Sequence, residues 1–366
     1  MTTVDPAPAS PAPIAIVGGG VVGLLTAVLL GERGHLCELI DARPDTGQGC
    51  SRHAGGMLAP LSELDLAEPA LAHLGLDAVA RWTAILGQDA LGDLLDARGS
   101  LLVAHRPEWP LLGQLLERVR SAGLEHHVAP IGRDRITELE PWIDGRLRRG
   151  LWIAGEGVVH PERLLPALRA RAAAAGVVMH DGVHVDRISP GRIEFADTAR
   201  ESDMVIDCRG LGARDDLPLR GVRGEYIVVR SGRVRLQRPV RLMHPRYPLY
   251  VVPRPDGKLY VGATQLESEH DGPVQTRSAL ELLSALYSLD PGFADAEIEH
   301  LGVGLRPAFA SNLPRIQVRP GAIALNGLFR HGFLLAPRLC SWVVDAVEGQ
   351  PLPEAAGPFC ETATPG

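Results

Sequence analysis

The spacing of hydrophobic and polar residues along the chain predicts elements of alternating type. An apolar run at residues 14–18 predicts a short buried strand, and residues 21–34 have the spacing and the closing glycine of a helix. A second apolar run at residues 36–42 predicts another strand. This order is typical of a βαβ unit with parallel strands.

Beyond this unit the pattern changes between helical and strand-like stretches. A β-rich stretch covers residues 225–267, where "PDG" at 255–257 supplies turn chemistry for a hairpin. A final helix is predicted to start near Pro337 and to end at Gly349. Further helices are predicted at residues 70–87, 108–123, 161–176 and 277–289.

The first predicted turn carries the glycines of a dinucleotide-binding motif. Gly18, Gly20 and Gly23 fit G-x-G-x-x-G directly after a strand and at the start of a helix, where backbone N–H groups can approach a pyrophosphate. Asp41 ends the second strand, in the position from which an acid binds ribose hydroxyls. The motif predicts a dinucleotide cofactor and does not choose between NAD and FAD.

Composition excludes some classes of partner. The chain has 366 residues and a formal net charge of −7, which argues against nucleic acid as a partner. The five cysteines show no CxxC pair, so neither a zinc site nor a disulfide framework is expected, and a reducing cytoplasm fits. Residues 1–13 are predicted to be a disordered tail, and no apolar run is long enough to span a membrane.

Four motifs together resemble a known family. "GGGVVG", "AGGMLAP", "GLRPAFASNLP" and "NGLFRHGFLLAP" look like the FAD-dependent D-amino-acid oxidase superfamily, and they are most similar to the glycine oxidases of thiamine biosynthesis. The resemblance covers residues 14–349 and implies that the cofactor is FAD. It also implies an α/β (α+β overall) fold, with a Rossmann-like FAD-binding domain and a second, antiparallel-sheet substrate domain.

The domains implied by the resemblance are discontinuous. The FAD-binding domain is expected to comprise residues 14–75, 150–215 and 300–366, and the substrate domain residues 76–149 and 216–299.

The loop after the second strand departs from the glycine oxidase pattern at His53. There the loop "SRHAGG" resembles that of dimethylglycine and sarcosine dehydrogenases, in which the histidine bonds covalently to the 8α-methyl carbon of FAD. A covalent bond and a non-covalent contact with the cofactor both remain open, since either suits a neutral imidazole. The other cofactor-binding residues expected in the shared motifs are Ser51, Gly55, Gly56, Met57 and Gly332.

The resemblance also implies the substrate-binding residues. Arg306 is expected in a loop after a strand, and the resemblance implies that it pairs with a substrate carboxylate. A planar guanidinium suits this role because it makes two parallel hydrogen bonds to a carboxylate. Tyr250 is expected either to assist at the carboxylate or to be a core residue, and Arg330 is the second arginine near the site. The N–H groups of the final helix are expected to face the flavin N1–C2=O edge. No general base is assigned.

The predicted activity is FAD-dependent oxidation of a small amino acid or amine to an imine by hydride transfer to flavin N5. The only lysine, Lys258, lies in the predicted hairpin turn, so the lysine that sarcosine oxidases place over the flavin has no counterpart here. The sequence does not decide whether dioxygen or another electron acceptor reoxidises the flavin. The exact substrate and the formation of a homo-oligomer also remain open. Two alternatives are a tailoring enzyme acting on a peptide-bound or natural-product amine, and a non-catalytic flavin-binding protein.

Overall fold

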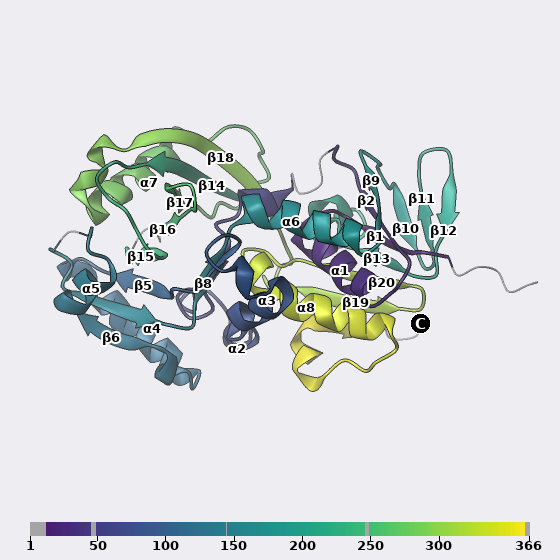
Figure 1. The fold of residues 1–366 in the computed structure, drawn as a ribbon, viewed down its shortest axis with the longest axis horizontal. Coiled ribbons are helices and arrows are strands. Elements are labelled where there is room, and N and C mark those ends of the chain that lie inside the picture. Colours follow the sequence, from purple (N-terminus) through teal and green to yellow (C-terminus); the bar gives the residue numbers. More distant parts are fainter. Residues whose placement is uncertain (1–11, 45–48, 144, 246–248, 363–366) are drawn as a thin grey trace, which may run out of the picture.

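The computed structural model describes residues 12–44, 49–143, 145–245 and 249–362. Most of the predicted tail, residues 1–11, lies outside these ranges. The described chain forms an elongated molecule in which two large sheets lie toward opposite ends (Figure 1). In the described part of the chain, no helix is long and apolar enough to cross a membrane.

The first large sheet has seven strands and contains the predicted βαβ unit. β1, β2, β9, β13 and β20 run parallel, whereas β19 is antiparallel to β20. Every side chain of β1 and β2 is buried, as parallel strands covered on both faces require. The strand order is β21 (Cys360–Thr362), β19 (Arg315–Arg319), β20 (Ala322–Asn326), β13 (Val205–Asp207), β1 (Ile14–Val17), β2 (Cys37–Asp41) and β9 (Val178–Asp181).

Helices cover one face of this sheet and a small antiparallel sheet covers the other. α1 (Val21–Glu32), α6 (Pro161–Ala174) and α8 (Gly332–Val347) lie together beside the sheet in Figure 1, and their apolar side chains form one buried cluster with β1. The opposite face packs on β10 (Arg187–Ser189), β11 (Arg192–Glu194) and β12 (Ala199–Glu201).

The second large sheet has eight strands, and all of its pairings are antiparallel except that of β15 with β5. Three helices accompany it: α4 (Trp109–Ser121), α5 (Arg133–Leu139) and α7 (Thr276–Leu289). The strand order is β18 (Glu297–Ala308), β14 (Arg220–Arg230), β17 (Lys258–Gly262), β16 (Leu249–Pro253), β15 (Val240–Leu242), β5 (Ser100–Val103), β7 (Arg149–Ile153) and β6 (Ala129–Gly132). The predicted fold class, a Rossmann-like unit plus an antiparallel sheet, is confirmed.

Between the two large sheets lie a three-stranded sheet and two short helices. The sheet comprises β3 (Met57–Leu58), β8 (Gly157–Val159) and β4 (Leu95–Asp96). The stretch predicted as one helix at residues 70–87 forms α2 (Pro69–Gly75) and α3 (Ala78–Leu86). In α3, Trp82 is fully buried against the α1–α8 cluster.

The two sheets group the chain differently from the predicted domain ranges. α3 packs with the first sheet's helices, although the predicted boundary falls at residue 75. β7 and most of β18 belong to the second sheet, although the ranges 150–215 and 300–366 assign them to the first domain. The division of the chain into domains stays a prediction.

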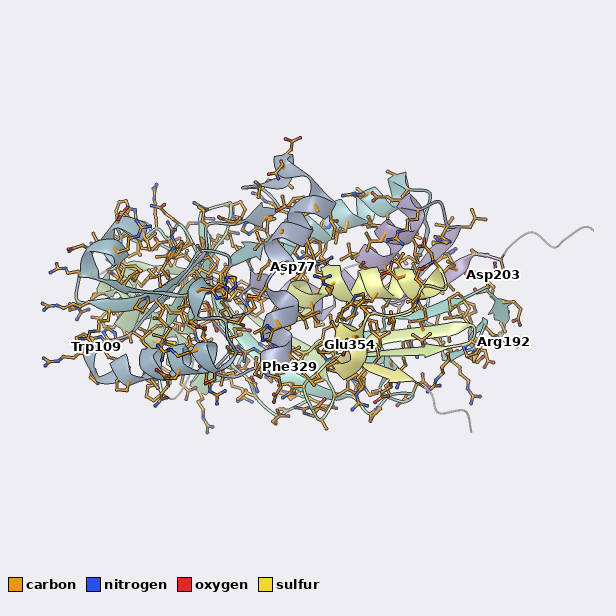
Figure 2. All side chains as sticks on the ribbon, turned by 90° about the horizontal axis from the view of Figure 1, so that it is seen from below. Asp77, Trp109, Arg192, Asp203, Phe329 and Glu354 are labelled. Carbon is orange, nitrogen blue, oxygen red and sulfur yellow. The ribbon has the colours of Figure 1, made fainter. Side chains whose placement is uncertain are left out.

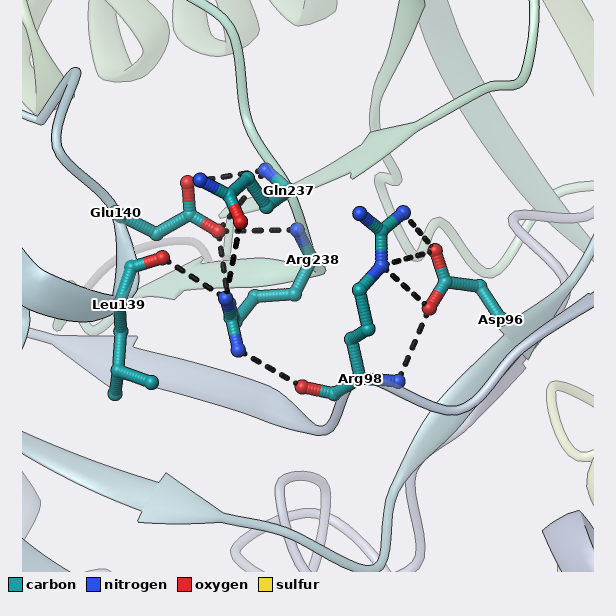
Figure 3. A network of polar contacts seen from close by, with 6 residues as sticks. All are labelled: Asp96, Arg98, Leu139, Glu140, Gln237 and Arg238. Atoms are coloured by element: carbon teal, nitrogen blue, oxygen red, sulfur yellow. Dashed lines mark hydrogen bonds and ion pairs between the residues drawn. The ribbon is translucent and has the colours of Figure 1, made fainter. Parts of the chain in front are cut away.

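A buried polar network joins three separate segments that flank the second sheet (Figure 3). The Glu140 carboxylate, after α5, accepts hydrogen bonds from the backbone N–H groups of Gln237 and Arg238, each at 3.0 Å, and from Arg238 Nε at 3.0 Å. Arg238 also donates to the carbonyls of Arg98 and Leu139. Because Glu140 is fully buried, these contacts replace its hydration and fix the end of α5 against the segment that leads into β15.

Candidate active site

A cavity of about 440 Å³ lies between the two large sheets, near Phe329 at the centre of Figure 2. Nine of the thirteen predicted site residues line it: Ser51, His53, Gly55, Gly56, Met57, Tyr250, Arg306, Arg330 and Gly332. The other four, Gly18, Gly20, Gly23 and Asp41, lie at the β1–α1 turn and its neighbouring strand, and Val21 of this turn reaches the cavity wall. The motifs separated in sequence therefore converge on one site.

The β1–α1 turn is packed tightly on one side and open on the other. Gly18 has a positive φ of 109°, and a Cβ there would lie 2.4 Å from the carbonyl oxygen of Cys208. A Cβ on Gly23 would lie 1.8 Å from the carbonyl oxygen of Gly18, whereas one on Gly20 would meet only Ser51 Oγ, at 3.3 Å. A ligand can therefore come close to the backbone at Gly20, as a pyrophosphate site requires.

Two predicted residues hold this turn in place. The Asp41 carboxylate accepts hydrogen bonds from the backbone N–H of Gly19 at 2.5 Å and from that of Arg43 at 2.8 Å. The Ser51 hydroxyl accepts a hydrogen bond from the backbone N–H of Val21 at 3.1 Å. Asp41 is therefore bonded to the turn before α1, and Ser51, in the loop after β2, is bonded to the first residue of α1.

The last helix begins earlier than predicted. α8 begins at Gly332, five residues before Pro337, so the predicted start is wrong. Pro337 lies inside the helix, where it has no N–H to donate to the carbonyl of Phe333. That carbonyl instead accepts a hydrogen bond from the Trp82 indole at 2.8 Å. Because α8 begins at Gly332, its first two residues, Gly332 and Phe333, line the cavity. The positive end of the helix dipole therefore points to the cavity.

His53 ends the 3-10 helix Cys50–His53 and is held by two tyrosines of the second sheet. Its Nδ1 lies 2.9 Å from Tyr226 Oη, and its carbonyl oxygen accepts a hydrogen bond from Tyr260 Oη at 3.1 Å. The two tyrosine rings stack, with centroids 4.7 Å apart. Arg254 donates to the next two carbonyls, those of Ala54 and Gly55, at 3.2 and 3.1 Å. The loop is thus fixed by side chains from β14, from β17 and from the turn between β16 and β17.

Glycines on β18 make room for this arrangement. Gly302 pairs with Tyr226 across the sheet, and a Cβ on Gly302 would lie 2.1 Å from Tyr226 Cζ. A Cβ on Gly304 would lie 3.0 Å from His53 Cβ. Burial lowers the pKa of His53, and the nearby His300, Arg52 and Arg43 lower it further. His53 is therefore neutral at pH 7, the form that can act as a nucleophile or a hydrogen-bond acceptor.

Arg306 lies within β18 and not in a loop after a strand, so this part of its prediction is wrong. β18 continues because β14 pairs with it as far as Ala308, and Pro307 is tolerated because β18 is an edge strand. The guanidinium lies over Gly224 of β14, where a Cβ would be only 2.3 Å from Nη2. Nη1 donates to the carbonyl of Thr264 at 3.1 Å, and no carboxylate of the described residues forms an ion pair with Arg306.

Arg330, the second cavity arginine, has a partner. Its Nη2 lies 2.6 Å from Glu63 Oε1, and both side chains are 13% exposed. The buried His331 places Nδ1 3.6 Å from the other Glu63 oxygen. Burial raises the pKa of Glu63, but the charge and the hydrogen bond of Arg330 outweigh this effect and hold that pKa below its usual value. Glu63 is therefore an ionised carboxylate in the cavity wall.

Tyr250, for which a functional and a core role were both open, lies on β16 and combines features of each. It is 5% exposed, packs in a cluster with Tyr226 and Tyr260, and still lines the cavity. Its hydroxyl is 3.4 Å from the carbonyl oxygen of Ser62. Burial raises the pKa of Tyr250, so the phenol keeps its proton and can donate a hydrogen bond at neutral pH.

Several cavity residues were not predicted. The cavity wall also includes Glu63, Tyr260 and Gln265. Tyr226 does not line the cavity but contacts the His53 ring. The only signal for Glu63 was an acid shortly after "AGGMLAP", in a stretch that also contains Asp65 and Glu68. Lys258, the only lysine, begins β17 after the predicted turn, pairs with Glu299 at 2.9 Å and does not line the cavity.

Comparison with known proteins agrees with the geometry. The family model described as DAO, FAD dependent oxidoreductase, matches residues 13–346. The chain belongs to this family. Its cofactor is therefore FAD, and the open glycine turn and the two helix N-termini at one cavity, those of α1 and α8, fit that dianionic, flavin-bearing group.

Individual relatives span nearly the whole chain. It is 38% identical over 342 residues to a Rhizobium etli protein named "Putative thiamine biosynthesis oxidoreductase ThiO", covering 92% of this chain and 98% of that protein. It is 28% identical over 367 residues to a glycine oxidase of Geobacillus kaustophilus, covering 95% and 96%. The crystal structure of glycine oxidase from Geobacillus kaustophilus matches with a TM-score of 0.83 at 28% identity, covering 97% of this chain and 100% of that one.

Proposed function

We propose that this FAD-dependent oxidoreductase oxidises the carbon beside the nitrogen of a small amino acid, of the glycine, sarcosine or D-amino-acid type. The observation that carries the proposal is Arg306, a guanidinium in the cavity wall whose recorded hydrogen bond goes to a backbone carbonyl and leaves the remaining donors for a ligand. The names of the relatives, a glycine oxidase among them, support the same substrate class.

Arg306 would bind the substrate carboxylate through two parallel hydrogen bonds and so fix the orientation of the α-carbon. The Tyr250 hydroxyl, on the same cavity wall, would donate to the same carboxylate. FAD, when bound, supplies the chemistry by accepting a hydride at flavin N5. The backbone N–H groups at the start of α8 would stabilise negative charge at the flavin N1–C2=O edge. Water then hydrolyses the imine to an oxo acid and ammonia or an amine.

We further propose that His53 would hold FAD covalently, through a bond from Nε2 to the 8α-methyl carbon. The methyl carbon and the imidazole would each lose a proton as this bond forms, and the two electrons released would pass through the flavin to the electron acceptor. Two observations support the bond: the imidazole is neutral, and Tyr226 occupies Nδ1, which leaves Nε2 for the cofactor. Acid precipitation tests it. Yellow colour that stays with the precipitate supports a covalent bond, whereas full release of the flavin to the supernatant contradicts it.

Anaerobic reduction of the flavin tests the substrate class. The yellow protein is mixed without oxygen with a panel of small amino acids and N-methyl amines, and the visible flavin absorbance is followed. Bleaching by a small amino acid supports the proposal, and dioxygen added afterwards distinguishes an oxidase from a dehydrogenase that uses another acceptor. If no compound of the panel bleaches the flavin, a peptide-bound or natural-product amine becomes the expected substrate.

We also propose that the protein works in a reducing compartment such as the cytoplasm, which the five free cysteines support.

A further inference from the structure

The two guanidinium groups of the cavity differ in how much charge they offer a ligand. Arg306 has no carboxylate partner among the described residues. Arg330 is 2.6 Å from the ionised Glu63, and its other recorded contact, with Gln265 Oε1, is 3.5 Å long. With His331 neutral because burial lowers its pKa to about 4, these four side chains present one net positive charge to a ligand.

Glu63 is held where it is by the loop that carries it. The buried Glu156 accepts hydrogen bonds at 2.8 Å from the backbone N–H groups of the two preceding residues, Leu61 and Ser62. These bonds fix the backbone on the N-terminal side of Glu63 and so keep this residue beside Arg330, where its carboxylate forms the 2.6 Å ion pair. A substrate carboxylate approaching Arg330 would therefore meet a negative charge already in place.

We propose that Glu63 is a specificity-determining residue that restricts the enzyme to substrates with a single carboxylate. Arg306 binds that carboxylate, and Glu63 keeps Arg330 from binding a second one. This inference rests on the proposed function, because it assumes that the cavity takes an amino acid. Glu63 acts here by repulsion of the wrong ligand, which is a common route to specificity.

Sarcosine and iminodiacetate are suitable probes, because they differ by a second carboxylate. Sarcosine is N-methylglycine, and iminodiacetate is the same molecule with a carboxylate added to the methyl carbon. The wild-type enzyme is expected to prefer sarcosine over iminodiacetate in kcat/KM by about tenfold or more. Glu63→Gln keeps the shape and one acceptor oxygen while removing the charge. It is expected to raise the ratio of iminodiacetate to sarcosine by about ten- to hundredfold, which is the worth of one hydrogen bond to a charged group.

The same loop offers a matched control. Asp65, two residues later, pairs with the buried Arg241 at 2.7 Å, and neither of them lines the cavity. Asp65→Asn removes the same charge at nearly the same place in the sequence, yet the ratio should stay at the wild-type value. Glu63→Asp keeps the negative charge on a side chain one methylene shorter, so its ratio should rise less than that of Glu63→Gln.

The result decides between two cases. A ratio that does not rise in folded, FAD-loaded Glu63→Gln, or that rises equally in Asp65→Asn, overturns the inference. If Glu63→Gln does not fold, the wild-type protein decides, because equal use of the two acids contradicts the proposed exclusion. If the wild type oxidises neither acid, the panel of small amino acids tests the proposed function separately. The dissociation constants of the two acids, read from the flavin absorbance of wild type and Glu63→Gln, then test the same ratio. Binding of neither acid also overturns the inference.

Discussion

Nδ1 of His53 lies 2.9 Å from Tyr226 Oη, although 173 residues separate them in the sequence. The contact exists because the β14–β18 pair places Gly302 opposite Tyr226 and leaves space for its ring. Since burial raises the pKa of Tyr226, the hydroxyl remains protonated around neutral pH. Tyr226 therefore fixes the orientation of the imidazole and leaves Nε2 as the nitrogen available to a cofactor.

This relationship predicts how the tyrosine affects flavin attachment. Tyr226→Phe should lower the fraction of FAD that stays with the acid-precipitated protein, because the imidazole loses the bond that orients it. Tyr260→Phe is the matched control, since its hydroxyl bonds the carbonyl of His53 and not the ring. His53→Ala should release all of the flavin. In-gel flavin fluorescence measures the fraction, and an unchanged value in Tyr226→Phe would show that the tyrosine does not position His53.

Arg306 is expected to dominate the binding of the substrate carboxylate. Arg306→Ala should raise the amino-acid concentration that gives half-maximal anaerobic bleaching by about ten- to hundredfold, since it removes a charge-assisted hydrogen bond. Arg306→Lys should recover part of the loss, because it keeps the charge without the planar fork. Arg230→Ala, on the same pair of strands but bonded to Glu299 away from the cavity, should behave as wild type. Equal effects of the Arg306 and Arg230 changes would contradict the assignment.

The buried network of Figure 3 predicts a large loss of stability from one change. Glu140→Gln should lower the free energy of unfolding by about 3–5 kcal/mol, because the buried Arg238 guanidinium loses its counter-charge. Glu201→Gln, which breaks an exposed ion pair with Arg192, is the control and should cause no measurable change. Urea unfolding measures both. Similar values for the two variants would mean that solvent screens the Glu140–Arg238 pair after all.

The sequence predicted best the parts whose cause is local. The β1–α1–β2 unit lies within a residue or two of its predicted bounds, because strand, glycine turn and helix are all determined by neighbouring residues. The start of α8 was missed because a distant residue, Trp82, satisfies the carbonyl that Pro337 leaves free. The edge position that allows Pro307 in β18 was likewise a property of the sheet and not of the segment.

The cavity residues that were predicted are those that belong to a motif shared with the family. Arg306 and Arg330 were found because their motifs resemble a family, and the structure brings both to one cavity. The partner of Arg330 was not found, since Glu63 lies 267 residues away and nothing local indicates the pair. Contacts of this kind set the charge of the site, so its specificity could not be predicted from single motifs.

Two buried histidines predict how stability depends on pH. Burial lowers the pKa of His160, which precedes α6, and that of His331, which precedes α8, to about 4 in each case. The unfolded chain binds these protons near pH 6.5, so between about pH 6.5 and 4 it binds more protons than the folded chain does. The free energy of unfolding should therefore fall as the pH is lowered through this window, by about 3 kcal/mol for each histidine at its lower end.

A variant isolates one of these contributions. His160→Gln cannot take up a proton, so its free energy of unfolding should fall less steeply than that of the wild type between pH 6.5 and 5, even if it is lower at pH 7. His184→Gln makes the same change of residue at an exposed position and gives the control. Urea unfolding at several pH values measures the slopes. The same steepness in wild type and His160→Gln would mean that His160 titrates alike in the folded and unfolded chains, as a solvated imidazole does.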